Sequence, residues 1–79
     1  MKTVEVTWLD AHCSTDDTTI DAAKKQKPIK TFTVGYLVAE NDEGVILATD
    51  RYAEDPKTVR MTNFVPWGMI EKYEVWEDG

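Results

Sequence analysis

An eight-residue segment, Asn63-Phe64-Val65-Pro66-Trp67-Gly68-Met69-Ile70, separates the last two alternating runs of this chain. Its proline has a fixed φ and no N–H, and its glycine adopts nearly any backbone dihedral, so the segment predicts a tight turn. Val65, Trp67 and Ile70 are apolar enough to cover the end of a small β-barrel. Because small closed barrels commonly join their last two strands by such a turn, the segment indicates a small all-β fold.

The rest of the chain contains further runs in which polar and apolar residues alternate with a period of two, as in half-buried strands. Together with the run after the turn, they predict strands at residues 3–9, 31–39, 45–49, 58–63 and 70–76. Gly35 lies where we expect a bulge or a sharp bend, as small barrels need. The polar segments 40–44 and 51–57 predict the turns between strands.

The long polar stretch between the first two strands predicts one short helix. Thr18-Thr19-Ile20-Asp21 has the character of a capping box, whose side chains accept hydrogen bonds from helical N–H groups. Ala22 and Ala23 favour a helix, the lysines that follow suit the negative end of its dipole, and Pro28 ends it.

This order of elements predicts an all-β fold, a five-stranded antiparallel barrel of the SH3-like or Sm-like kind, formed by one domain over residues 1–79. An oligonucleotide-binding barrel is the nearest alternative. That fold usually has its helix between the third and fourth strands, where this chain has only a short turn. The expected core consists of Val4, Val6, Phe32, Val34, Leu47, Val59, Met61, Val65, Ile70 and Val75.

The charge of the chain argues against binding to nucleic acid. Nine Lys and Arg against fifteen Asp and Glu give a net charge of −6, and residues 41–79 carry nine acids and four bases. Such a surface repels phosphate, and non-specific nucleic-acid binding needs clustered Lys and Arg. A lone cysteine, Cys13, and the lack of a leader or of a long apolar run favour a cytoplasmic protein that does not contact membranes.

Three strand patterns and the turn 64–70 together carry a resemblance to a known group of proteins. The strand patterns are Val6-Thr7-Trp8-Leu9-Asp10-Ala11, Val34-Gly35-Tyr36-Leu37-Val38 and Val45-Ile46-Leu47-Ala48-Thr49. They resemble the small early-region proteins of tailed bacteriophages, and the resemblance covers nearly the whole chain. It implies an accessory protein made in an infected bacterial cell, of the size class from which anti-defence proteins come. Several such proteins sequester a nucleotide signal or mask a host enzyme. No catalytic residue carries over.

The arginines around the second hairpin offer one candidate ligand site. A guanidinium binds carboxylate or phosphate with its planar edge and stacks on bases with its face. If two hairpins and the turn meet at one barrel end, these groups form a nucleotide-binding pocket; the alternative is surface ion pairing of Arg51 and Arg60 with neighbouring acids. The candidate ligand-binding residues are Arg51, Tyr52, Arg60, Asn63, Trp67 and Asp10.

The end of the first strand places Asp10, His12 and Cys13 close together in sequence. One Cys and one His are too few for a usual zinc site, and adjacent residues of an extended segment point to opposite sides, which disfavours a Cys–His nucleophile pair. The simpler alternative is that Asp10 accepts local backbone hydrogen bonds. We therefore expect no metal, no cofactor and no enzymatic activity.

Three functions remain open from the sequence. The first is sequestration of a small anionic, nucleotide-like ligand, and the second is masking of a host protein by the acidic surface from Glu71 through Asp78. The third, a structural or RNA-associated role of the Sm-like kind, is disfavoured by the charge. Trp67 and Trp76 either cover the barrel end or form an interface, and we expect a homo-oligomer built through the edge strands.

Overall fold

A computed structural model describes residues 1–11 and 15–78 of the chain. Its strands are β1 (Lys2–Asp10), β2 (Ile29–Glu40), β3 (Gly44–Arg51), β4 (Val59–Pro66) and β5 (Ile70–Asp78); a helical turn α1 (Ile20–Ala23) follows β1, and a 3-10 turn η1 (Trp67–Met69) precedes β5. The predicted all-β class and the five predicted strands are confirmed.

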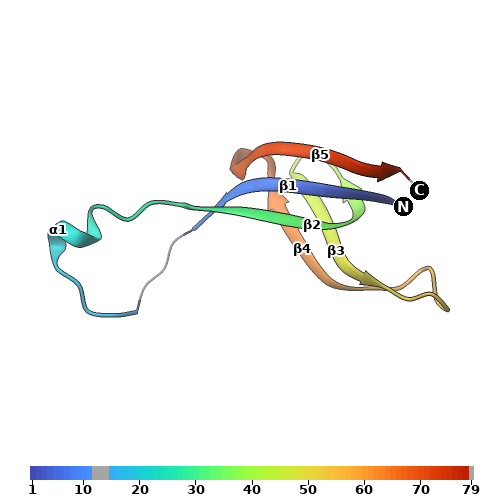
Figure 1. Cartoon of the computed structure of the whole chain (residues 1–79), viewed down its shortest axis with the longest axis horizontal. Helices are drawn as coiled ribbons and strands as arrows, with labels where there is room; N and C mark the ends of the chain where they lie inside the picture. Colours follow the sequence, from blue (N-terminus) through green and yellow to red (C-terminus); the bar gives the residue numbers. More distant parts are fainter. Residues whose placement is uncertain (12–14, 79) are drawn as a thin grey trace.

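The five strands form one antiparallel sheet in the order β4-β3-β2-β1-β5. Figure 1 shows β5, β1 and β2 running side by side, with β3 and β4 crossing beneath them. β4 and β5 lie at the two ends of the order, and no ladder joins them within the described residues. The sheet is therefore not closed there, and the closed barrel that the sequence predicts is not confirmed.

The predicted short helix is present and lies far from the sheet. Thr19 is its N-cap, with the hydroxyl accepting a hydrogen bond from the backbone N–H of Ala22 at 3.1 Å. The helix buries no residue, and Figure 1 shows it at the outer end of an arm formed by the segment between β1 and β2. This arm accounts for the elongated shape, with extents of 52 × 23 × 20 Å.

The core consists of fully buried valines and one leucine from three strands, Val4, Val6, Val45, Leu47 and Val65, against which Trp8, Leu37, Met69, Ile70 and Tyr73 pack. Because these side chains come from β1, β3, β4 and β5, the sheet must curl so that one face of β1 meets β3 and β4. Val4, Val6, Leu47, Val65 and Ile70 thus lie in or against the core as predicted, and Val59 is half-buried.

Four predicted core residues are wrong: Phe32, Val34, Met61 and Val75 are exposed. On β2 the reason is the register, because Phe32 lies opposite Thr7 and Val34 opposite Glu5. These pairs point away from the face that carries Val4 and Val6, since successive strand residues alternate between faces. Met61 and Val75 lie on the edge strands β4 and β5, away from the parts of those strands, Val65 and Ile70 to Tyr73, that pack in or against the core.

Gly35 has a different role from the predicted one. It pairs in register with Val4, and the irregularity of β2 lies later, between Leu37 and Ala39. A Cβ atom at Gly35 would lie 2.7 Å from the carbonyl oxygen of Ala48 on β3. The glycine is therefore needed because the β3 backbone approaches β2 too closely for any side chain.

Gly35→Ala should lower the free energy of unfolding by about 1–3 kcal/mol, because the added methyl group meets backbone that has no rotamer to change. Gly68→Ala is the matched control, since nothing lies within 4 Å of a Cβ there and its φ is not positive. Urea unfolding followed by tryptophan fluorescence measures both. Equal stabilities of the two variants would contradict the close approach of β3 to Gly35.

Candidate functional site

Arg60 lies near the turn that joins β3 to β4, at the connected end of this hairpin. It lies opposite Asp50 in the ladder, and its Nε and Nη2 donate hydrogen bonds to the same carboxylate oxygen at 2.9 and 2.7 Å. The guanidinium also lies over the ring of Tyr52, 5.8 Å from the centroid. The ion-pair alternative from the sequence therefore describes Arg60, while part of its surface stays exposed.

Arg51 lies on the other side of the same hairpin. It pairs with Val59, one position along the ladder from the pair that Asp50 makes with Arg60. The Arg51 guanidinium stacks 4.9 Å from the centroid of the Tyr36 ring on β2. The two arginines thus contact different tyrosine rings, Arg51 that of Tyr36 and Arg60 that of Tyr52.

Trp67 lies at the opposite end of the β3–β4 ladder, next to the pair that Gly44 makes with Pro66. Its indole Nε1 donates a hydrogen bond of 2.6 Å to the carbonyl oxygen of Asn41, in the turn between β2 and β3. Its ring also lies 6.0 Å from that of Tyr73 on β5. Trp67 therefore connects that turn to the core rather than lining a pocket with the arginines.

The two remaining candidate residues also lie apart from the arginines. Asn63 is exposed on β4 opposite Leu47. Asp10 ends β1, and its carboxylate accepts a hydrogen bond of 2.8 Å from the N–H of Ala11, which is the local bond that the simpler alternative predicts. His12 and Cys13 lie outside the described residues.

The structure does not bring all of these groups together. The register separates Arg60 from Trp67 along the length of β4, whereas Arg51, Tyr52 and Arg60 lie at the same end of the hairpin. No pocket is found in the part of the chain that the structure describes. Residues of that part also include no group of three or more His, Cys, Asp and Glu that could hold a metal ion.

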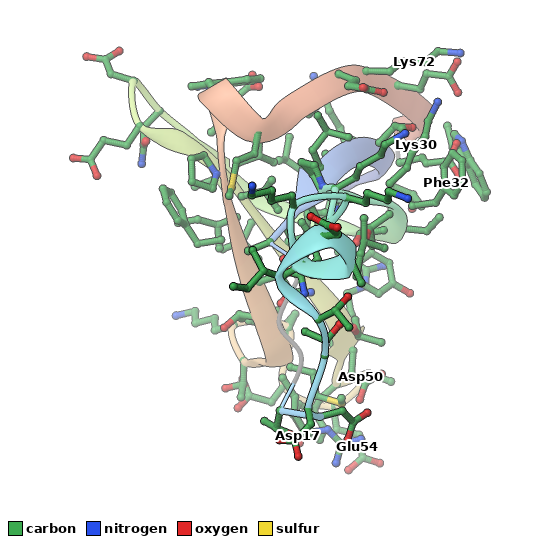
Figure 2. All side chains as sticks on the ribbon, turned by 90° about the vertical axis from the view of Figure 1, so that its left-hand side faces the viewer. Asp17, Lys30, Phe32, Asp50, Glu54 and Lys72 are labelled. Atoms are coloured by element: carbon green, nitrogen blue, oxygen red, sulfur yellow. The ribbon has the colours of Figure 1, made fainter. Side chains whose placement is uncertain are left out.

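A surface that the sequence did not reveal lies on the outer face of β1, β2 and β5, defined here as the side away from the core. Phe32 is 64% exposed and Val34 40% exposed, at alternate positions of β2. Thr7, between Phe32 and Lys72 in the ladder, is buried. Figure 2 shows Phe32 with Lys30 and Lys72 on one side of the molecule, away from Asp50 and Glu54.

Charged pairs border this outer face on the side of β5. Lys72 lies 2.6 Å from Glu74, and Lys30 lies 3.6 Å from Glu71. The hydrogen bond and the charge of Glu74, with a smaller effect of Glu5, raise the pKa of Lys72. The apolar stripe on β2 thus borders a strip where carboxylates and lysines neutralise one another. The alternation of Phe32 and Val34 was visible in the sequence, but the face they occupy was not.

The edge strands carry the other exposed apolar groups. Met61 and Phe64 on β4 and Trp76 on β5 are exposed, and Trp67 is only partly covered. The prediction that Trp67 and Trp76 are not core residues agrees with this placement. Both edges therefore offer apolar side chains beside unpaired strand backbone.

Tyr73 gives the folded state a pH dependence. Burial, followed by the nearby carboxylate of Glu40, raises the pKa of the Tyr73 phenol above its ordinary value of 10.0. A group with a raised pKa in the folded state stabilises the fold at lower pH, and this contribution is lost as the pH rises above about 10. Tyr73→Phe should therefore flatten the fall in the free energy of unfolding above that pH, measured by urea unfolding at a series of pH values. Lys72, whose pKa is also raised, is present in both proteins. Identical slopes of the free energy of unfolding against pH in the two proteins would contradict the raised pKa of Tyr73.

Among the described residues, no helix is long and apolar enough to cross a membrane. Comparison of the chain with protein-family models, curated proteins and solved structures gives no significant match.

Proposed function

We propose that this chain is a non-enzymatic accessory protein of a tailed bacteriophage that acts in the cytoplasm of the infected cell by binding and masking a host protein. The resemblance of the strand and turn patterns supports the phage origin. The observation that carries the masking function is the exposed apolar stripe on the outer face, where Phe32 and Val34 lie on regular, paired strand backbone rather than on a loop.

The same proposal includes an SH3-like or Sm-like barrel as the fold. The strand order β4-β3-β2-β1-β5 and the 3-10 turn between β4 and β5 support it. The curl that brings side chains of β1, β3 and β4 into one core supports it as well. In such a barrel the outer face is convex and rigid, which suits a surface that meets a partner without rearranging.

An apolar stripe of this kind suits a protein partner more than a small molecule. Small ligands are usually enclosed in concave sites, whereas protein interfaces are broad and bury apolar and aromatic side chains near their centre. Phe32 would lie at that centre, flanked by Val34 and by the paired charges Lys72 and Glu74. Aromatic side chains at the centre of an interface commonly carry much of the binding energy.

The charge of β5 indicates the chemistry of the partner. Between Ile70 and Asp78 the chain has four acids and one lysine, and the whole chain has a net charge of −6. Because lysines neutralise Glu71 and Glu74 beside the stripe, it is the net charge of the whole chain that would draw a basic surface with an apolar hollow by long-range attraction. The host protein is therefore one whose masked surface is basic, such as a groove that otherwise receives nucleic acid.

Native mass spectrometry of the protein isolated from infected cells tests this function. We expect a complex with a host protein, lost in Phe32→Thr, because that change removes exposed apolar area while keeping strand propensity. Ile20→Thr is the matched control: Ile20 is 76% exposed but lies on α1, far from the outer face, so the complex should persist. A bare protein, or a complex lost equally in both variants, would contradict the proposal.

Sequestration of a small anionic ligand is a second candidate because both arginines of the hairpin are already stacked on tyrosine rings. Phosphate or a nucleotide would compete with Asp50 for Arg60. Asp50→Asn should therefore increase the stabilisation that ATP gives in a thermal melt, and Arg60→Ala should abolish it. No ATP-dependent shift in either the wild-type protein or Asp50→Asn would remove this candidate.

A further inference from the structure

β4 is open to solvent on both faces over part of its length and along one edge. Its consecutive residues from Arg60 to Phe64 are all exposed. Since neighbouring strand residues point to opposite faces, both faces of β4 are uncovered there. Its outer edge is also free of a ladder in the described sheet, because β4 is the terminal strand of the order.

The exposed part of β4 contains large apolar groups on a strained backbone. Met61 is 65% exposed and Phe64 49% exposed. Met61 also has a φ of 58°, in the left-handed region that non-glycine residues seldom adopt. Such strain persists where a function needs it, and a long apolar side chain held out to solvent at that position indicates a contact.

The two edges of the sheet differ in how they are protected against pairing. β5 has two register shifts in its ladder with β1, and it contains four acids and one lysine. Bulges and charges are the usual devices that prevent an edge from pairing with another chain. β4 has one charged residue, Arg60, and that charge is neutralised by Asp50 on the neighbouring strand.

We propose that β4 pairs antiparallel with β4 of a second copy of this chain, across a two-fold axis, to form a continuous sheet. A second copy fits because the chain has a net charge of −6 and β4 is an edge without carboxylates, so two copies approach there with least repulsion. The pairing would also cover Met61 and Phe64 and supply partners for the edge N–H and C=O groups.

A register centred on Thr62 makes the edge complementary to itself. It places Thr62 opposite Thr62 of the partner subunit, a pair that hydroxyl hydrogen bonds favour in sheets. It also places Arg60 opposite Phe64 of the partner subunit, twice by symmetry, so that a neutralised guanidinium meets an aromatic ring. This interface is separate from the outer face, and the β4 pairing goes beyond the masking function. An experiment can therefore contradict the pairing without contradicting the masking function, and the reverse.

Sedimentation velocity of the wild-type protein tests the pairing, with an expected mass of twice the chain's 9.0 kDa at micromolar concentration. Thr62→Lys should give the monomer mass, because it places two like charges directly opposite each other. Thr18→Lys adds the same charge to the exposed arm and should leave the dimer intact. A monomeric wild-type protein, a dimeric Thr62→Lys, or dissociation caused by Trp76→Lys instead would overturn the proposal.

Cysteine cross-linking tests the register without relying on a loss of association. In a Cys13→Ser background, Thr62→Cys should form a disulfide-linked dimer under mild oxidation, because each residue faces its own copy across the axis. Thr18→Cys in the same background should stay unlinked. Equal linking of the two variants, or linking of neither while sedimentation shows a dimer, would overturn the β4 pairing.

Discussion

The close approach of β3 to Gly35 is the constraint on which the rest of the structure depends. With no side chain at that position, the Ala48 carbonyl lies within contact of β2, and β3 can fold across the sheet rather than extend it flat. Val45 and Leu47 then reach Val4 and Val6, which lie two strands away in the order. The absence of a side chain at Gly35 thus allows β3 to lie close to β2 while one face of the sheet encloses the core.

The same curl determines which apolar residues are left outside. A core supplied mainly by valines from one face of each strand is small, and it cannot hold the aromatic groups that the opposite face of β2 carries. Phe32 and Val34 are therefore exposed as a consequence of the fold, and the edge strand β4 has no layer above or below its central residues. Exposed apolar surfaces of this kind are candidate interaction sites.

Strand positions could be predicted from the sequence because the period-two alternation and the turn residues are local signals. The short helix that begins after Thr18 and Thr19 and the placement of Trp67 and Trp76 outside the core also followed from local chemistry. The buried face of β2 could not be predicted from the sequence, because alternation fixes which residues share a face but not which of the two faces is buried. The expected ligand site could not be located from the sequence because alternation does not give the distance between two residues in the folded sheet: the register places Arg60 and Trp67 at opposite ends of the β3–β4 ladder.

The arm that carries α1 adds nothing to the core, since the helix buries no residue and β1 and β2 are already joined by a continuous ladder. The cost of closing a loop rises only with the logarithm of its length, by about 0.6 kcal/mol for a doubling. The segment between Asp10 and Ile29 can therefore lengthen, shorten or change composition with little effect on the stability of the sheet. Changes of length or sequence in this segment are therefore expected to lower the stability of the fold less than changes within the strands of the sheet.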